Sequence, residues 1–177
     1  NLAEYLSDDD LITPFTRLSS FYQGQGLYPL AQPWSEKGKE IAEKRLDKNN
    51  SNIATAYTHL ANLYRAQGKY EAAEPLFLQA IEIDEIALPE NHPDIARHLN
   101  SLAGLYRAQG KYEAAEQLYL QAIEIHKIAL PENHPERASD LNNLAVLYKS
   151  QGKYEAAEPL YLQAIEIHKI ALPENHP

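Results

Sequence analysis

The residues with the most reactive side chains recur at fixed spacing, and their surroundings argue against catalysis. Lysine follows glycine at Gly68, Gly110 and Gly152, as in phosphate-binding loops, but the next residue is tyrosine rather than Ser or Thr, and the other glycine of such a loop is missing. The sequence has no cysteine and no Gly-x-Ser-x-Gly motif of the hydrolases. We therefore expect no nucleotide site, no nucleophile and no enzymatic activity.

Five of the seven histidines form two sets, one before prolines and one inside predicted helices. The first is His92, His134 and His176, and the second is His126 and His168, at the place that Asp84 holds in an earlier segment. Ligands of one zinc ion lie about 2 Å from the metal, whereas equivalent side chains of neighbouring helical layers are about 8–10 Å apart. We expect these histidines to serve connector geometry, and we expect no metal and no other cofactor.

Composition and charge limit the partners. The chain has 177 residues, 44% of them hydrophobic, and 16 basic against 25 acidic residues give a net charge of −9. This charge repels phosphate backbones and anionic lipid, so we expect no nucleic acid and no membrane as partner. The lack of cysteine and of a signal-like start at Asn1 favours a cytoplasmic protein. The lack of methionine, and a final segment that copies an internal connector, predict a piece of a longer protein.

A repeat of 42 residues organises the chain. The pattern Tyr-x-x-Gln-Gly-Lys-Tyr-Glu-Ala-Ala-Glu begins at Tyr64, Tyr106 and Tyr148, which are 42 residues apart. A further shift of 42 residues aligns Tyr22 with Tyr64 and reveals a fourth, degenerate copy. Such self-similarity is typical of repeat architectures, in which each unit stacks on its neighbour.

Each unit predicts two helices joined by a tight turn. Apolar residues fall at helical spacing, first at Leu99, Leu102, Ala103 and Tyr106, then at Tyr112, Ala115, Tyr119, Ala122, Ile123 and Ile125. Gly110 stands where the first helix must end, and Pro93 and Pro135 open the next first helices. We expect most tyrosines to be packing residues. Because one hairpin cannot bury its own apolar face, we expect stacked antiparallel hairpins with a continuous core.

The unit resembles the tetratricopeptide repeat. The matching positions are Ala103, Tyr106, Gly110, Tyr112, Ala115, Tyr119 and Ala122. The common unit has about 34 residues, so the 42-residue length and the Leu-Pro-Glu-Asn-His-Pro connector resemble the repeat of kinesin light chains and of many bacterial signalling proteins. The resemblance implies an all-α, right-handed α-solenoid that binds proteins, with the first helices lining a concave groove.

The predicted boundaries follow the period. We expect the end of an upstream helix and a linker in residues 1–10, a degenerate first repeat in 11–50, and repeats in 51–92, 93–134 and 135–177. Trp34, Ser35, Gly38 and Lys39 depart from the pattern, so the second helix of the first repeat should pack differently. This repeat resembles the one that follows the nucleotide-binding STAND (NB-ARC) module of cyanobacterial proteins. The aspartates at 8–10 should cap the helix that begins between Leu11 and Pro14.

A ligand face is predicted on the first helices, away from their packing stripe. Steps of three, four and three residues from Arg97 select one side of a helix. With their equivalents in the other two regular repeats, these positions are Thr55, Thr58, Asn62 and Arg65; Arg97, Asn100, Gly104 and Arg107; and Ser139, Asn142, Val146 and Lys149. We call these residues the first-helix face.

The kinesin-light-chain resemblance gives this face a role. It implies that Asn100 and Asn142 hold the backbone of an extended peptide, and that Arg65, Arg107 and Lys149 suit acidic side chains. Lysines of the carboxylate clamp found in chaperone-binding relatives are absent. The basic residues could equally neutralise the last turns of their helices.

Two functions therefore remain open. The first is an interaction module that binds an extended acidic peptide segment and acts as the sensor or scaffold arm of a larger signalling protein. The alternative is a structural array that packs within its own protein or associates with itself through the C-terminal repeat.

Overall fold

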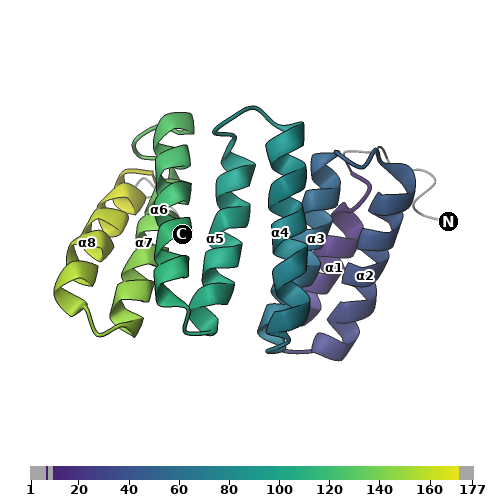
Figure 1. The fold of residues 1–177 in the computed structure, drawn as a ribbon, viewed down its shortest axis with the longest axis horizontal. Coiled ribbons are helices and arrows are strands. Elements are labelled where there is room, and N and C mark those ends of the chain that lie inside the picture. The colour runs from purple at the N-terminus through teal and green to yellow at the C-terminus, as the bar shows by residue number, and fades with distance from the viewer. Residues whose placement is uncertain (1–6, 8–9, 172–177) are drawn as a thin grey trace. The chain divides into compact units, whose positions relative to one another are not determined.

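In the computed structural model, which describes residue 7 and residues 10–171, all regular secondary structure is helical (Figure 1). The helices are α1 (Thr13–Gly24), α2 (Tyr28–Arg45), α3 (Ser51–Ala66), α4 (Tyr70–Ala87), α5 (Pro93–Ala108), α6 (Tyr112–Ala129), α7 (Pro135–Ser150) and α8 (Tyr154–Ala171). Consecutive helices form antiparallel hairpins, α1 with α2 and so on to α7 with α8. Each predicted repeat contains one hairpin, and the predicted all-α class is confirmed.

The chain divides into two compact units, residues 1–88 and residues 89–177. The first unit holds α1 to α4 and the second holds α5 to α8. In the first, α3 packs against α2 as well as against its own partner α4; in the second, α7 packs against both α6 and α8. Within each unit, one hairpin thus covers an apolar face of the other, as stacking of repeats requires.

Each hairpin turns at a glycine with a left-handed backbone. The φ angles of Gly26, Gly68, Gly110 and Gly152 are 72°, 73°, 75° and 76°. At the third turn, the N–H of Lys111 donates to the carbonyl of Tyr106 at 2.9 Å. Glycine adopts this conformation without a steric penalty, so the predicted turns are confirmed.

The lysine after each of the last three turn glycines lies over a tyrosine ring. The Nζ atoms of Lys69, Lys111 and Lys153 lie 5.6, 4.9 and 5.4 Å from the ring centres of Tyr64, Tyr106 and Tyr148. These are cation–π distances. The recurring Gly-Lys pair therefore belongs to the packing of the turn.

Connector histidines cap the first helices of the second unit. Nδ1 of His92 accepts a hydrogen bond from the N–H of Asp94, and Nδ1 of His134 accepts one from the N–H of Glu136, both at 3.2 Å. Prolines occupy the first helical positions, where a missing N–H costs nothing. The expected connector role is confirmed for these two histidines, and His176 lies outside the described residues.

Small and large apolar residues pack together in the core of each unit. In the second unit, α5, α6 and α7 bury Ala103, Ala115, Tyr119, Ile123, Leu144 and Leu147 together. Leu99 and Leu102 are buried as predicted, whereas Tyr106 is half-buried. The first unit buries Leu11, Ile12, Phe15, Ile41, Ala42, Leu46, Ile53 and Ala56 together. Among the tyrosines expected to pack, Tyr154 is 66% exposed.

The second helix of the degenerate repeat does pack differently. The hydroxyls of Ser19 and Ser35 form a buried hydrogen bond of 2.6 Å, at positions where the next repeat has Ala61 and Phe77. A Cβ on Gly38 would lie 3.0 Å from the Cβ of Phe15. Glycine therefore makes room for the phenylalanine.

α1 begins within the predicted range, but its capping differs from the prediction. The helix begins at Thr13, but its N-cap is Ile12 and no side chain caps it. The carboxylate of Asp10 accepts a hydrogen bond from the hydroxyl of Ser7 at 2.9 Å instead. Pro14 has no N–H, so the first turn has one donor fewer to cap. Asp8, Asp9 and residues 1–6, where most of the upstream helix was predicted, lie outside the described residues.

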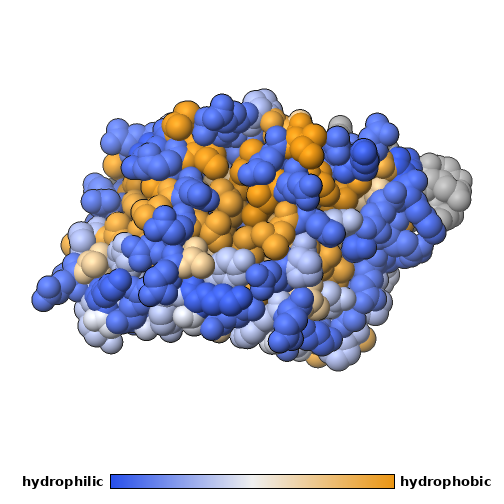
Figure 2. Space-filling model, viewed as in Figure 1, coloured by the Kyte–Doolittle hydropathy of each residue, from blue (hydrophilic) through white to orange (hydrophobic). Residues whose placement is uncertain are grey.

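The second helices also carry exposed apolar side chains. Figure 2 shows apolar residues among polar ones on the visible side of α6 and α8, and Ile128, Leu162 and Ile170 are more than half exposed.

None of the helices within residues 10–171 has both the length and the apolar character needed to cross a bilayer.

Candidate functional site

Two members of the first-helix face, Arg97 and Asn100, are tied to other side chains of the second unit. Arg97 pairs with Asp94 on its own helix and, through Nε, with Glu136 of α7 at 2.7 Å. The amide Nδ2 of Asn100 donates to Oδ1 of Asp140 at 2.7 Å. Both side chains therefore connect α5 to α7.

Asp140 is the centre of a buried polar network. Its Oδ2 lies 2.7 Å from Nδ1 of His126, and the two side chains are 2% and 1% exposed. The Nε2 of His126 lies 3.2 Å from the carbonyl oxygen of Pro93 and 3.4 Å from Oε2 of Glu136. The network thus links α5, α6 and α7 through hydrogen bonds and opposite charges.

The surroundings of His126 favour its charged form. Burial alone would lower the pKa of the imidazole. The hydrogen bond to Asp140, the charges of Asp140 and Glu136 and the carbonyl of Pro93 outweigh burial and raise the pKa above its usual value. A protonated imidazole donates from both nitrogens, which matches acceptors on its two sides.

The expected connector role is wrong for His126, which lies inside α6. Helical spacing does not identify its pair with Asp140, although the sequence contains a signal for it. His126 stands 42 residues after Asp84, and Asp140 stands 42 residues after His98. The acid and the histidine have therefore exchanged positions between consecutive copies. Asp84 and His98 are themselves buried, at 0% and 5% exposure. This compensated exchange is the signal in the sequence for the interacting pair His126 and Asp140.

The remaining polar members of the first-helix face on α7 are accessible. Ser139, Asn142 and Lys149 are exposed. The hydroxyl of Ser139 donates to the carbonyl of Pro135 at 3.2 Å. The amide of Asn142 has no hydrogen-bond partner within residues 10–171.

On α5, the C-terminal half of the face contains Arg107 and Gly104. Arg107 is half-buried, and its Nε is buried without a hydrogen-bond partner among the described residues. Gly104 is buried in the core, so the face is interrupted there. Val146 is half-buried on α7.

The first unit contributes the other predicted positions from α3. Thr55, Thr58, Asn62 and Arg65 are all half-buried. They come from one helix at the predicted spacing, so each unit has its own part of the first-helix face.

The described residues show no metal-binding cluster: no three His, Asp or Glu side chains of residues 7 and 10–171 lie together where they could hold an ion. The polar chemistry of the second unit consists of the buried network and the accessible amide and cationic groups. This arrangement can accept and donate hydrogen bonds and attract negative charge.

Comparison with known proteins identifies the repeat. A sequence model of the tetratricopeptide repeat matches residues 10–86 and 94–170, and a second model of this repeat matches residues 58–129. No curated protein sequence matches the chain.

Solved structures match nearly the whole chain. BtubC (BKLC) from P. vanneervenii is 24% identical with a TM-score of 0.77, and the match covers 99% of this chain and 70% of that chain. A structure of a point variant, described as a kinesin light chain of Podosopora anserina with nearly identical TPR-like repeats, is 26% identical, with a TM-score of 0.76 and coverages of 98% and 82%. A second structure of the same Podosopora anserina protein has 25% identity, a TM-score of 0.68 and coverages of 97% and 82%.

These structures share the stacked helical hairpins of this chain, which confirms the predicted solenoid class. The family match covers most of the sequence, and its segments include all four hairpins. The chain belongs to the tetratricopeptide repeat family, with repeats like those of kinesin light chains.

Proposed function

We propose that this protein binds an extended acidic segment of another protein on its first-helix face. Tetratricopeptide repeats generally mediate protein–protein interaction, and proteins built from them are typically scaffolds without catalysis. The preference for acidic segments rests on two basic side chains that have no ion-pair partner among the described residues. Arg107 and Lys149 lie on the first helices of the second unit and have no carboxylate partner within residues 10–171.

The proposal divides the predicted asparagines by role. Asn142 is exposed and offers a free amide, which can donate to and accept from a peptide backbone. Asn100 donates to Asp140, so it acts as a positioning residue for α7. Arg97 likewise positions Glu136. Ser139 completes the part of the proposed surface in the second unit, and the α3 residues Thr55, Thr58, Asn62 and Arg65 form the part in the first unit.

The expected affinity is modest. The accessible side chains of this face are polar or basic and provide few apolar anchors, so binding energy comes mainly from hydrogen bonds and charge. We expect micromolar dissociation constants, on the order of −8 kcal/mol. An interaction of this strength suits the sensing or recruiting arm of a larger cytoplasmic signalling protein, as in the STAND proteins that the first repeat resembles.

The test compares binding of extended peptides rich in Asp and Glu with binding of their Asn and Gln counterparts by fluorescence anisotropy. A variant with Arg107→Glu and Asn142→Ala should lose at least tenfold in affinity for the acidic peptides. Lys169→Glu reverses an exposed charge on α8 and is the control. The proposal is refuted if acidic and amide peptides bind equally well, or if Lys169→Glu loses as much affinity as the double variant.

Self-association is the second candidate. Tyr154 and Leu162 on α8 are 66% and 61% exposed, and a second copy of the chain is one partner that would cover them. Sedimentation or light scattering over a range of concentrations decides this point. A mass that rises with concentration, and that Leu162→Lys returns to the monomer, supports self-association; a constant monomer mass excludes it.

A further inference from the structure

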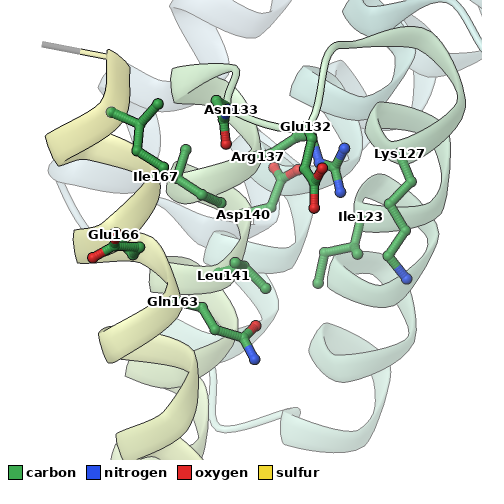
Figure 3. Close-up of a pocket in the computed structure, with 11 residues that line it drawn as sticks. Ile123, Lys127, Glu132, Asn133, Arg137, Asp140, Leu141, Gln163, Glu166 and Ile167 are labelled. Atoms are coloured by element: carbon green, nitrogen blue, oxygen red, sulfur yellow. The ribbon is translucent and has the colours of Figure 1, made fainter.

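A cavity of about 350 Å³ lies between α6, α7 and α8 of the second unit (Figure 3). Its apolar wall includes Ile123 of α6, Leu141 of α7 and Ile167 of α8, and its cations are Lys127 and Arg137. The volume falls in the range of about 300–1,000 Å³ that is typical of small-molecule pockets. The first-helix residues proposed to bind peptide do not line it.

The first unit shows what fits the equivalent place. The residue 84 positions before Leu141 is Tyr57. The Tyr57 hydroxyl donates to Oε1 of Glu43 on α2 at 2.6 Å, and the Nζ of Lys39 lies 5.2 Å from the ring centre. Tyr57 and Ile83 of α4 both pack against the same buried apolar cluster. A phenol ring on α3 thus occupies the corresponding region between α2 and α4, where the second unit has only Leu141.

The residues around the ring have changed together with it. Lys127 stands at the place of Glu43, and Ile123 at the place of Lys39. The acceptor that meets the phenol hydroxyl has become a cation, and the cation over the ring has become an apolar side chain. The second unit therefore keeps ring-sized space but reverses the charge at its polar end.

A second cation has entered the same region. Arg137 replaces Ile53, which is 3% exposed in the first unit. Arg137 is half-buried and has no ion pair with the described residues. A guanidinium binds a carboxylate through two parallel hydrogen bonds. Lys127 pairs with Glu124, but both of these side chains are at least half exposed.

Three carboxylates also line the cavity, but none of them forms an ion pair with Arg137 among the described residues. Both oxygens of Asp140 are engaged, by His126 and by Asn100. Glu166 lies on α8 and is exposed to solvent. Glu132 lies at the rim, on the exposed connector before α7.

We propose that this cavity binds a small aromatic carboxylate. The ring lies against Ile123, Leu141 and Ile167, as the Tyr57 ring lies in the first unit, and the carboxylate meets Arg137 and Lys127. This ligand site is separate from the proposed peptide surface. An aromatic side chain of a protein that carries an anionic group has the same chemistry. The experiment therefore distinguishes a free small molecule from a protein side chain.

The probe is para-hydroxyphenylacetate, which carries the tyrosine ring and a carboxylate. Binding to the full chain is followed by calorimetry and by NMR shift perturbation, beside para-cresol, which lacks the charge, and cyclohexylacetate, which lacks the aromatic ring. We expect saturable binding at about millimolar concentration or below. Both control compounds should bind at least tenfold more weakly.

The first unit supplies matched variants. Leu141→Tyr should fill the cavity and abolish binding without lowering the melting temperature, because the equivalent position already holds a tyrosine. Arg137→Ile introduces the residue that the first unit has at this position. It should weaken binding of para-hydroxyphenylacetate at least tenfold and leave the affinity for para-cresol unchanged. The variant with Arg107→Glu and Asn142→Ala should bind the aromatic acid normally, so failure here and failure of the peptide proposal are distinguishable.

Several results would overturn the proposal: no saturable binding, unchanged binding in both Leu141→Tyr and Arg137→Ile, or equal affinity for para-cresol and the acid. N-acetyl-phosphotyrosine amide is the probe for a protein source. If it binds tenfold more tightly than the free acid, the ligand is a modified side chain and the small-molecule assignment is wrong.

Discussion

The imidazole of His126 on α6 and the carboxylate of Asp140 on α7 form a buried hydrogen-bonded pair, with 2.7 Å between Nδ1 and Oδ2. The amide of Asn100 on α5 donates a hydrogen bond to the other oxygen of the carboxylate. The pair therefore joins the third and fourth hairpins at one point of the core. Its neighbours along the repeat interface, such as Ala103 and Leu144, are apolar.

Removal of the carboxylate should destabilise the second unit strongly. Asp140→Ala leaves Nδ1 of the buried His126 without its acceptor, and breaking a buried pair in this way costs about 3–5 kcal/mol. Urea unfolding followed by circular dichroism measures the change in the free energy of unfolding.

The chain itself suggests the control for this variant. His126→Asp combined with Asp140→His places the two groups in the order that the sequence has at Asp84 and His98. The double variant should recover most of the stability that Asp140→Ala loses. If the exchanged pair is as unstable as the single variant, complementarity of the two side chains is not what stabilises this interface.

The same pair makes stability depend on pH. Its environment raises the pKa of His126 above the ordinary value near 6.5. The native state therefore holds a proton that the unfolded chain releases first, so this contribution is complete below about pH 6.5 and disappears as pH rises through the folded pKa. The free energy of unfolding should fall over that interval.

A difference measurement isolates this effect from the other histidines. The stability of the wild type minus that of His126→Asn, measured by urea unfolding at a series of pH values, should decline as pH rises above about 6.5. A difference that is flat, or that grows with pH, would contradict the raised pKa.

Core and surface positions of neighbouring first helices should respond differently to truncation. Leu102 is 2% exposed, so Leu102→Ala should cost about 2–5 kcal/mol through lost contacts and a cavity. Asn142 is exposed without a hydrogen-bond partner within residues 10–171, and Asn142→Ala should leave stability nearly unchanged. Thermal unfolding of the two variants checks both, and a large loss in Asn142→Ala would show that its side chain has a structural role.

The features that repeat could be predicted from the sequence, because each is local and occurs several times. The turn at Gly110 and the start at Pro93 depend on backbone preferences of single residues, and the period locates them. The core position of Leu102 follows from helical spacing alone.

The features that depend on pairs of repeats were harder to predict. Helical spacing predicted that Arg97 and Asn100 face a ligand. In the structure, Arg97 forms an ion pair and Asn100 a hydrogen bond with side chains of α7. Helical spacing within one repeat carries no information on such partners in the next repeat. The cavity beside Leu141 depends on the absence of a ring that another repeat has. Only comparison of equivalent positions, Tyr57 with Leu141, reveals such a difference.

The turn glycine offers a direct test of backbone strain. Gly110 has a φ of 75°, and nothing lies within 4 Å of a Cβ built on it. Gly110→Ala should therefore lower stability by about 1–2 kcal/mol through its left-handed backbone rather than through a clash. Gly110→Asn should lower stability less than Gly110→Ala does, since asparagine tolerates this conformation better than alanine. Equal stability of all three proteins in urea would contradict a strained turn.

Charge reversal and salt should act alike on the proposed peptide surface. If acidic side chains bind at Arg107 and Lys149, the dissociation constant should rise as ionic strength increases, because the Debye length falls from about 10 Å at 0.1 M to about 3 Å at 1 M. Lys149→Glu should weaken binding of an acidic peptide and flatten its salt dependence, since the remaining field is smaller. Anisotropy titrations at several salt concentrations measure both slopes. A salt-independent affinity in the wild type would mean that the two basic residues serve their own helix ends instead, the interpretation that the sequence left equally open.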